Sequence, residues 1–488
     1  MGTYSEIRRL CEDRVFHYFY EISQIPRGSG NEQEISNYVF HWAQKHGFFV
    51  IQDGYFNVFI RKEKVQEISS EKSVLLQAHM DMVCEKKPDS THDFKKDGIS
   101  WNLNGDLLSS GSETTLGADD GIGMAIAMAI LEEDSFEFPE LEVLFTTSEE
   151  EDLSGAEGFD MSYVKSSFLI NLDHVNENEI LCGSCGGEAA EVTIPVKWEK
   201  SLEGWKNFEI KVEGLKGGHS GEDIGAGHGN ANKILARLLY ELSEKEVYGL
   251  CDFKGGNFRL AIPREAQCTV AMSEEKFHRV SKWMDTFKAM IKEEYESAAE
   301  HIQIYMRKSN QKYDNYCKPY QVIIAILLST DGIFEMSSNR KGDINTSDNL
   351  GEVYLEEQGC RIIYEIRSLY DSSKQYLKKL IKMHADNLGG TCQFYFPYPS
   401  WKYKEHSELR NVAETVYQKN NHGKPRIYCV HAGLECGSFF EKRPDLDAIS
   451  IGPNCWGLHS PEETLSISSV KKFYINLKEI LKNINKHD

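Results

Sequence analysis

Short apolar runs alternate with helical stretches over roughly the first 185 residues, and this alternation limits the possible folds more than any other feature. Three runs indicate buried strands that end in polar residues: SVLLQAHMD (73–81), LEVLFTTSEE (141–150) and SSFLINLD (166–173). Between the first two, GADDGIGMAIAMAILEED (117–134) predicts a helix entered through Gly and Asp. Strands that alternate with helices predict an α/β domain with a parallel sheet.

The middle of the chain has a different pattern, which predicts a second domain. Alternating strand patterns at 208–214 and 353–368 accompany long helical patterns at 228–245 and 275–302. This mixture favours an α+β domain with helices on one face of an antiparallel sheet. The α/β pattern returns with a helix at 407–420, a strand at 446–452 and a helix at 469–485. We therefore expect a discontinuous α/β domain of residues 1–186 and 400–488, with residues 187–399 inserted into it.

The charge balance and the cysteine content indicate which kinds of partner the protein does not bind and in which cellular compartment it is expected. The chain has 55 Lys and Arg against 76 Asp and Glu, a net charge of −21, which argues against binding to nucleic acid or to an anionic membrane. No apolar stretch is long enough for a membrane helix, and the N-terminus lacks a signal pattern. We expect a cytoplasmic protein whose 12 cysteines are reduced. The single CxxC, from Cys182 to Cys185, has no second pair, so we interpret it as packing.

Residues of the types that bind metals follow the predicted strands of the α/β domain. Sites in open α/β sheets form at the carboxyl ends of the strands, so these side chains are expected to meet at one edge. They are His79 and Asp81, Asp119 and Asp120 in the next turn, Glu149 and Glu150, Asp173, and His459 after the C-terminal strand. Such clustered carboxylates repel each other unless a cation neutralises them.

The composition of this cluster indicates the kind of metal. Histidine nitrogen and carboxylate oxygen without a cysteine set suit zinc first, with manganese or cobalt as alternatives. Two histidines and three carboxylates suffice for two ions if one carboxylate bridges them, and such a pair of ions can activate a water. A carboxylate that is not a ligand then serves as base, and the doublet Glu149–Glu150 offers one residue for each role.

Seven motifs in order make the resemblance specific. They are HMDMV, TLGADDGIGMA, the SEE of TTSEEE, NLD, KGGHSGEDI, HAGLECG and GLHSPEE. Together they resemble the aminoacyl-histidine dipeptidases, also called cytosol non-specific dipeptidases, of the carnosinase and aminoacylase clan of metallopeptidases. The resemblance implies a two-metal peptidase domain with an inserted lid and dimerisation domain. It also implies hydrolysis of dipeptides, both of the Xaa-His type and with broad specificity, by a homodimer.

The resemblance also implies a role for each residue of the metal site. His79, Asp119 and Asp173 hold one ion, and Asp119 bridges to a second ion that Glu150 and His459 complete. Asp81 orients the His79 ring. Glu149 is the general base that takes a proton from the water and passes it to the leaving amine.

Further roles fall on the inserted domain and on the HAGLECG motif. His219, on a glycine loop, corresponds to the histidine that stabilises the oxyanion, and in the clan this histidine can enter the partner's active site. Arg367 resembles the lid arginine that grips the substrate carboxylate. Asn345, with Asn230 and Asn232, is a weaker candidate for carboxylate contact or lid structure. His431 and Glu435 match the pattern, and Glu435 is either an acceptor for the free amino group of the peptide or part of a structural turn.

Some residues depart from the family pattern and leave alternatives open. Asp120 stands where we expect Asn, and SEEED stands where DEEAG is usual, so extra charge lies beside the site. No candidate ligand is lost. Residues 311–320 match no pattern. The alternatives are an amidase or deacylase of N-acyl amino acids, which needs no amine pocket, and a non-catalytic peptide-binding homologue, which would lack Glu149 or a ligand.

Overall fold

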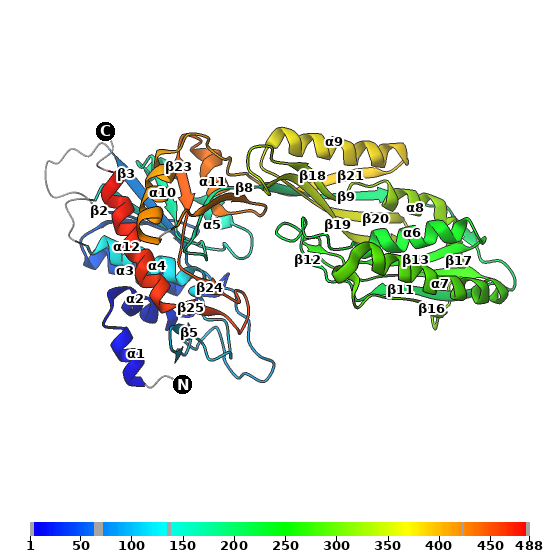
Figure 1. The fold of residues 1–488 in the computed structure, drawn as a ribbon, viewed down its shortest axis with the longest axis horizontal. Helices are drawn as coiled ribbons and strands as arrows, with labels where there is room; N and C mark the ends of the chain where they lie inside the picture. The colour runs from blue at the N-terminus through cyan, green and yellow to red at the C-terminus, as the bar shows by residue number, and fades with distance from the viewer. Residues whose placement is uncertain (1–3, 63–71, 134–137, 422, 485–488) are drawn as a thin grey trace. The chain divides into compact units, whose positions relative to one another are not determined.

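The computed structural model describes residues 4–62, 72–133, 138–421 and 423–484 (Figure 1). Its internal contacts divide the chain into two compact units. Unit 1 comprises Met1–Gly183, Trp401–Cys429 and Leu434–Asp488, and unit 2 comprises Ser184–Ser400 and Val430–Gly433. The sequence placed the limits of the inserted domain at 187 and 399 and assigned all of 400–488 to the α/β domain. The structure differs in giving residues 184–186, 400 and 430–433 to the inserted unit.

Unit 1 is built around a mixed sheet in the order β1-β2-β6-β3-β7-β23-β8-β22. Its strands are β1 (Phe49–Gln52), β2 (Val58–Lys62), β3 (Ser73–His79), β6 (Glu140–Thr146), β7 (Phe168–Asn171), β8 (Glu179–Ser184), β22 (Arg426–Val430) and β23 (Asp447–Ser450). The neighbours β6, β3, β7 and β23 run parallel, so their carboxyl ends meet at one edge. A small sheet joins β24 (Cys455–Trp456), β25 (Thr464–Ser466), β5 (Leu107–Ser109) and β4 (Asn102–Asn104).

The helices of unit 1 cover this sheet and complete its core. They are α1 (Tyr4–Leu10), α2 (Arg14–Ser23), α3 (Gln33–Lys45), α4 (Ala118–Leu131), α5 (Ser154–Gly158), α10 (Glu408–Asn421), α11 (Glu435–Lys442) and α12 (Ile467–Ile484), with a 3₁₀ turn at Met161–Tyr163. The middle helix α4 is apolar all round, as is typical of a helix with no solvent face, and it packs between α2 and β3. The expected ends of two helices, Asp134 and Asn485, lie outside the described residues.

Unit 2 is an antiparallel sheet with helices, in the order β16-β11-β15-β13-β19-β20-β9-β21. Its strands are β9 (Gly186–Ile194), β10 (Trp198–Lys200), β11 (Lys206–Glu213), β12 (Gly218–His219), β13 (Gly249–Gly255), β14 (Ala261–Ile262), β15 (Ala266–Met272), β16 (Gln303–Lys308), β17 (Asn315–Cys317), β18 (Gly332–Met336), β19 (Ile344–Glu356), β20 (Gly359–Ser368) and β21 (Thr391–Tyr398). Its helices are α6 (Ala231–Ser243), α7 (Glu274–Tyr295), α8 (Pro319–Leu327) and α9 (Asp371–Asn387), with a 3₁₀ turn at Glu296–Ala299.

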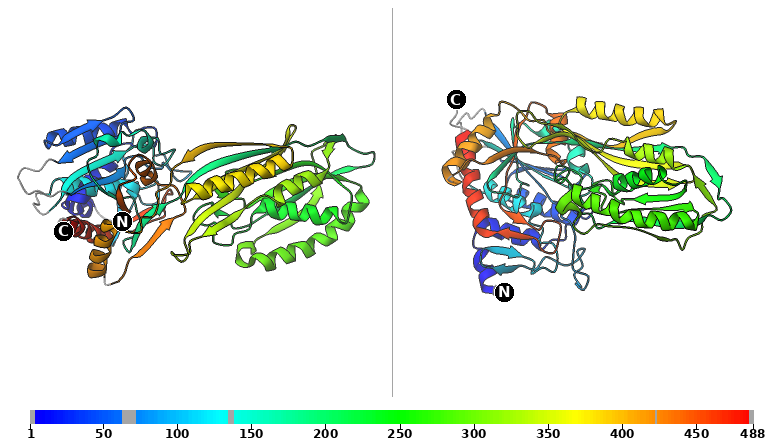
Figure 2. Two further views of the ribbon diagram at one scale, coloured as in Figure 1. Left: turned by 90° about the horizontal axis from the view of Figure 1, so that it is seen from above. Right: turned by 45° about the vertical axis from the view of Figure 1, so that its right-hand side comes forward.

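The same βαββαβ topology occurs twice in unit 2. In chain order β11, α6, β13, β15, α7 and β16 form one copy, and β9, α8, β19, β20, α9 and β21 form the other. In each copy the fourth strand pairs with the first, the first with the third and the third with the second, and β13 joins β19 edge to edge. Figure 2 shows α9, in yellow, running along the strands of its own copy. The first copy is inserted between β9 and α8 of the second, and this interleaving leaves no regular repeat in the sequence.

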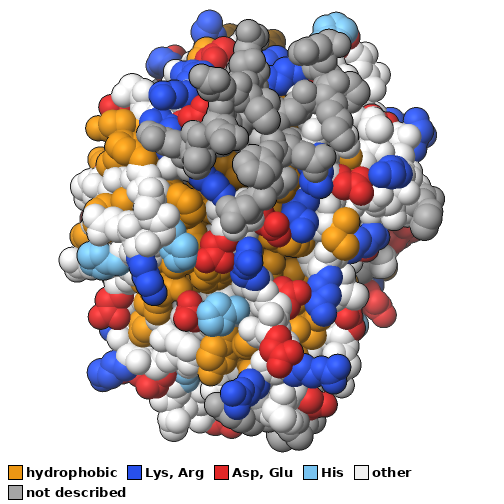
Figure 3. All heavy atoms as spheres, turned by 90° about the vertical axis from the view of Figure 1, so that its left-hand side faces the viewer, with side chains coloured by type: hydrophobic (Ala, Val, Ile, Leu, Met, Phe, Trp, Pro, Cys, Tyr) orange, Lys and Arg blue, Asp and Glu red, His pale blue; other side chains and the backbone are white. Residues whose placement is uncertain are grey.

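The surface and the helices bear on two predictions from the sequence, the acidic net charge and the lack of a membrane helix. The face drawn in Figure 3 shows basic and acidic side chains interspersed, so the acidic excess does not form a single-sign surface there. Among the described residues no helix combines the length and the apolar character that a membrane crossing requires.

Candidate metal centre

The predicted metal-binding side chains of unit 1 come together at the carboxyl edge of its parallel strands. His79 is the last residue of β3, Asp173 lies two residues beyond β7, and Glu149 and Glu150 follow β6. Asp119 comes from the turn that opens α4, where the φ and ψ angles are still non-helical. His459 comes from the loop between β24 and β25.

Two groups of three side chains share Asp119. Its Oδ1 lies 3.1 Å from Nε2 of His79, and its Oδ2 lies 3.2 Å from Nε2 of His459. On the first side Asp173 Oδ1 lies 3.6 Å from His79 Nε2, and on the second Glu150 Oε1 lies 2.9 Å from His459 Nε2. His79 with Asp119 and Asp173, and Asp119 with Glu150 and His459, each bring their ligand atoms within 4.8 Å of one another. The two oxygens of one carboxylate thus face two separate groups.

The donor set fits divalent ions better than it fits a network of hydrogen bonds. The buried oxygen Glu150 Oε1 accepts no hydrogen bond from the described residues, although it lies 2.9 Å from His459 Nε2. Burial, followed by the charge of Asp119, raises the pKa of Asp173 well above its usual value. Close carboxylates in a buried site cannot all ionise unless a cation compensates them. A third group of three, His79, Glu149 and Glu150, lies equally close.

Asp81 contacts the His79 ring and the backbone of Glu149 and Glu150. This fully buried side chain has its Oδ1 3.3 Å from His79 Nδ1 and accepts hydrogen bonds from Ser29 Oγ and from the backbone N–H groups of Glu149 and Glu150. One carboxylate therefore orients a histidine of the first group and fixes the backbone of both glutamates. Burial raises the pKa of Glu149 well above its usual value, which suits a group that must bind and release a proton.

Glu435 lies in the same unit, beneath the strand ends. It is buried, and its Oε2 accepts hydrogen bonds from Gln77 Nε2 (2.6 Å) and Thr146 Oγ1 (2.9 Å). Its Oε1 is buried without a hydrogen-bond partner among the described residues. Burial raises the pKa of Glu435 to about 7. The carboxylate therefore keeps one open acceptor position.

The other predicted residues belong to unit 2. Nδ1 of His219 accepts hydrogen bonds from the backbone N–H groups of Gly221 (3.3 Å) and Glu222 (3.1 Å), so in the neutral ring Nε2 carries the proton. Burial, with a smaller contribution from Arg367, lowers the pKa of His219 to about 4. The imidazole is therefore neutral at physiological pH and is a donor through Nε2.

Arg367 is anchored within unit 2. Its Nη1 donates to Tyr398 Oη (2.8 Å) and its Nη2 to Ser220 Oγ (3.2 Å), while its buried Nε has no partner among the described residues. The guanidinium therefore contacts the residue that follows His219 in the chain.

The remaining candidates have structural partners. His431 was expected in the α/β domain, but it belongs to unit 2, where residues 430–433 contact Cys185, β21 and the His219 loop. Its Nε2 is 2.6 Å from Ser347 Oγ. Glu435, in the same motif, belongs to unit 1. Asn345 accepts from Arg340 and donates to the Met336 carbonyl in the β18–β19 hairpin. Asn230 caps α6 through the N–H of Asn232.

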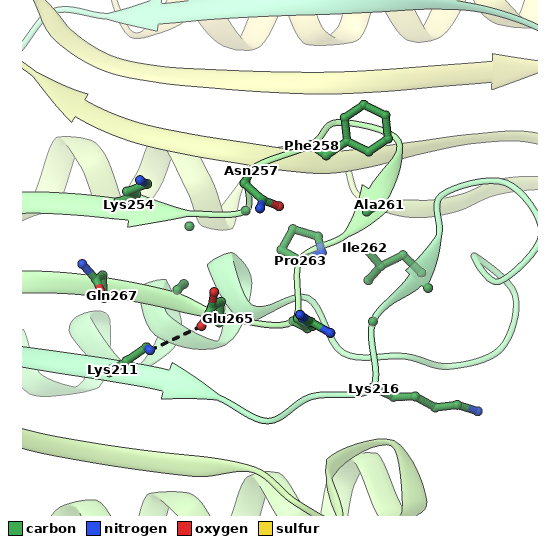
Figure 4. Close-up of a pocket in the computed structure, with 16 residues that line it drawn as sticks. Lys211, Lys216, Lys254, Asn257, Phe258, Ala261, Ile262, Pro263, Glu265 and Gln267 are labelled. Atoms are coloured by element: carbon green, nitrogen blue, oxygen red, sulfur yellow. Dashed lines mark ion pairs between the residues drawn. The ribbon is translucent and has the colours of Figure 1, made fainter. Parts of the chain in front are cut away.

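A groove of about 580 Å³ also lies within unit 2 (Figure 4). Among its charged lining residues, Lys211, Lys216, Lys254 and Arg264 are basic and Glu265 is acidic. Lys211 forms an ion pair with Glu265, drawn as a dashed line in Figure 4. None of the predicted catalytic or substrate-binding side chains is among the residues that line it.

Known proteins resemble this chain over nearly its whole length. It is 36% identical over 482 residues to the cytosol non-specific dipeptidase of Escherichia coli (strain K12), a match that covers 98% of this chain and 99% of the relative. The chain belongs to the family of cytosol non-specific dipeptidases. The crystal structure of aminoacylhistidine dipeptidase from Vibrio alginolyticus matches with a TM-score of 0.88 and 33% identity over 98% of both chains. The predicted family, fold class and enzyme class, a dipeptidase among the metallopeptidases, are confirmed.

Two further matches concern the fold. Residues 210–299 match the peptidase dimerisation domain, and they lie in the first βαββαβ copy of unit 2. Aminopeptidase PepT from Bacillus cereus has the same fold, with a TM-score of 0.54, 16% identity, and coverage of 96% of this chain and 98% of that chain. The fold of the whole chain is therefore shared with this more distant structure.

Two buried residues at the site were missed by sequence reasoning. Arg27 and Glu463 make their contacts with backbone groups of the turns that carry Asp81 and Asp119. Glu463 stands in the GLHSPEE motif, which was a usable signal. Arg27 stands in a loop with no such signal.

Proposed function

We propose that this dipeptidase hydrolyses the peptide bond of dipeptides, both of the Xaa-His type and with broad specificity, with two divalent metal ions. The observation that carries the proposal is that Asp119 belongs to two groups of three candidate ligands. Its Oδ1 faces one group and its Oδ2 faces the other. His79, Asp119 and Asp173 would hold one ion, and Asp119, Glu150 and His459 would hold the other. Zinc is the first choice, with manganese and cobalt as alternatives. When bound, such ions polarise the scissile carbonyl and acidify a water.

The residues of the chain supply proton transfer and orientation. Glu149 takes a proton from the attacking water and passes it to the leaving amine. Asp81 keeps the His79 ring and the Glu149–Glu150 backbone in place. His219 donates from Nε2 to the carbonyl oxygen as charge develops there, and the two backbone N–H groups at its Nδ1 support this tautomer.

The substrate ends are assigned to charged groups. Arg367 binds the carboxylate of the peptide, with Asn345 and His431 nearby in its own unit as weaker candidates. Glu435 accepts the free amino group through Oε1, which has no hydrogen-bond partner in the described part of the chain. An amine acceptor favours dipeptides over N-acyl amino acids, because an acylated amine carries neither the charge nor all the donors of an ammonium group.

A substrate panel tests this function. Dipeptides, tripeptides and acetyl-amino acids are assayed with Zn²⁺, Mn²⁺ and Co²⁺, and dipeptides are expected to give the highest kcat/KM. Preference for acetyl-amino acids would favour the deacylase alternative. Binding of peptides without hydrolysis under all three metals would favour the non-catalytic alternative.

We also propose a cytoplasmic homodimer. The dimerisation-domain match supports the dimer, and the name of the Escherichia coli relative supports the compartment. Co-expression of differently tagged His219→Ala and Glu149→Ala chains tests whether His219 serves the partner's site. Action in the partner's site restores about a quarter of wild-type sites in a statistical mixture. An active monomer would contradict both the dimer and this role.

A further inference from the structure

Glu463 binds the backbone of the turn that carries Asp119. It is only 2% exposed and lies between β24 and β25. Its carboxylate accepts hydrogen bonds from four consecutive backbone N–H groups: Leu116 at 2.7 Å and Gly117 at 3.0 Å on Oε2, and Ala118 at 2.8 Å and Asp119 at 3.4 Å on Oε1. These contacts fix the backbone of Asp119 itself.

The shape of this turn explains why a carboxylate is needed. Gly117 has a φ of 70°, and Asp119 and Asp120 are not yet helical. In this turn the N–H groups of Leu116 to Asp119 all donate to one carboxylate. Successive N–H groups arranged in this way form a concave site for an anion. Glu463 fills it from within the protein.

Arg27 holds the same turn from its carbonyl side. The guanidinium, 1% exposed, donates to the carbonyl oxygens of Met80 and Asp81, each at 2.9 Å, and to that of Gly117. A Cβ atom at Gly117 or Gly121 would lie 2.5 Å from Arg27 Nη2, which accounts for these glycines of the motif. The buried cation also compensates the negative charge of Glu463.

We infer that Glu463 is a positioning residue that fixes Asp119 relative to His459. His459 stands four residues earlier on the same loop, and its Nε2 lies 3.2 Å from Asp119 Oδ2. One short loop therefore supplies both a proposed ligand and the anchor of the ligand that it faces. This inference rests on the proposed two-metal function. It predicts that loss of Glu463 weakens metal binding. If Glu463 only capped the helix, its loss would leave the metal affinity unchanged.

The test compares Glu463→Gln with Glu462→Gln. The neighbouring Glu462 is exposed and loses the same charge, so it is the matched control. Glutamine at 463 keeps one acceptor oxygen and turns an NH₂ group toward two of the four N–H groups. The affinity of metal-free protein for Zn²⁺ is measured by competition with a chelating dye. Loss of a residue that orients ligands costs about 10–100-fold in metal affinity.

We expect this loss for the more weakly bound ion in Glu463→Gln and wild-type affinity in Glu462→Gln. Raised Zn²⁺ should restore most of the kcat of Glu463→Gln, because the catalytic groups remain. Glu463→Asp, which keeps the charge on a shorter side chain, should lose less affinity and is the variant to measure if Glu463→Gln does not fold.

The outcomes separate this inference from the proposed function. If wild type binds two ions and the folded Glu463 variant binds both as tightly, the positioning role is wrong and the two-metal function stands. If wild type itself does not bind two ions, the proposed function fails first.

Discussion

Replacing Asp81 with Asn tests how far the site depends on one buried carboxylate. Oδ1 of Asp81 faces His79 Nδ1 at 3.3 Å and accepts from the Glu149 N–H at 3.0 Å. Oδ2 accepts from Ser29 at 2.8 Å and from the Glu150 N–H at 3.2 Å. Because an amide has a single oxygen, either orientation of Asn turns an NH₂ group toward one of these two backbone N–H groups.

The magnitude follows from these contacts. At least one hydrogen bond to a charged group is lost, which costs about 1.5–3 kcal/mol of folding free energy. Loss of the carboxylate behind His79 lowers metal affinity by about 10–100-fold. Ser29→Ala removes only the hydroxyl contact and is the control. Zn²⁺ affinity by chelator competition and urea unfolding of the metal-free protein measure the two effects. The reasoning would be refuted if Asp81→Asn had the same Zn²⁺ affinity and the same stability as Ser29→Ala.

Three further predictions concern single residues. Glu149→Gln should keep both ions while kcat falls by at least about 10²–10⁴, whereas Glu150→Gln should release an ion; metal analysis with the opposite result means that the roles are exchanged. His219→Ala should lower kcat by about 10²–10³ without moving the acidic limb of the pH–rate profile, because its pKa of about 4 keeps it neutral; a shifted limb would contradict this. Burial raises the pKa of Asp348 to about 7, so the folded protein favours its protonated form and stability falls as pH rises from about 4 to about 7. In urea unfolding, the stability of Asp348→Asn relative to wild type should rise by up to about 4 kcal/mol as pH rises across that range. Curves of unfolding free energy against pH that stay parallel for the two proteins would contradict this.

The strands that carry the site were predictable because each is a continuous apolar run that ends at a polar residue. The runs at 73–81, 141–150 and 166–173 contain β3, most of β6 and all of β7. Since parallel strands place their carboxyl ends together, His79, Glu150 and Asp173 were expected to meet, and the structure brings them to one edge.

Other parts of the fold left no usable pattern in the sequence. The helix expected over 275–302 ends at Tyr295, because Glu296 takes a positive φ of 46°. The repeated βαββαβ topology was invisible because one copy interrupts the other. Residues 430–433 join unit 2 through contacts with strands distant in sequence, which no local pattern reports.

The residues that support the ligands were missed for a different reason. Glu463 and Arg27 bind backbone N–H and C=O groups, which every residue possesses. Pattern reasoning finds side chains that pair with side chains of a particular type. Partners of the main chain become visible only when the turn at Gly117–Asp119 is seen in three dimensions.

The most direct test of the account is a titration of metal-free protein with Zn²⁺, with dipeptide hydrolysis and bound metal measured at each step. The shared carboxylate of Asp119 predicts that activity reaches its maximum at two ions per chain and that Asp119→Ala retains neither ion tightly. Full activity at one ion per chain, or in the presence of excess chelator, would contradict the two-metal mechanism.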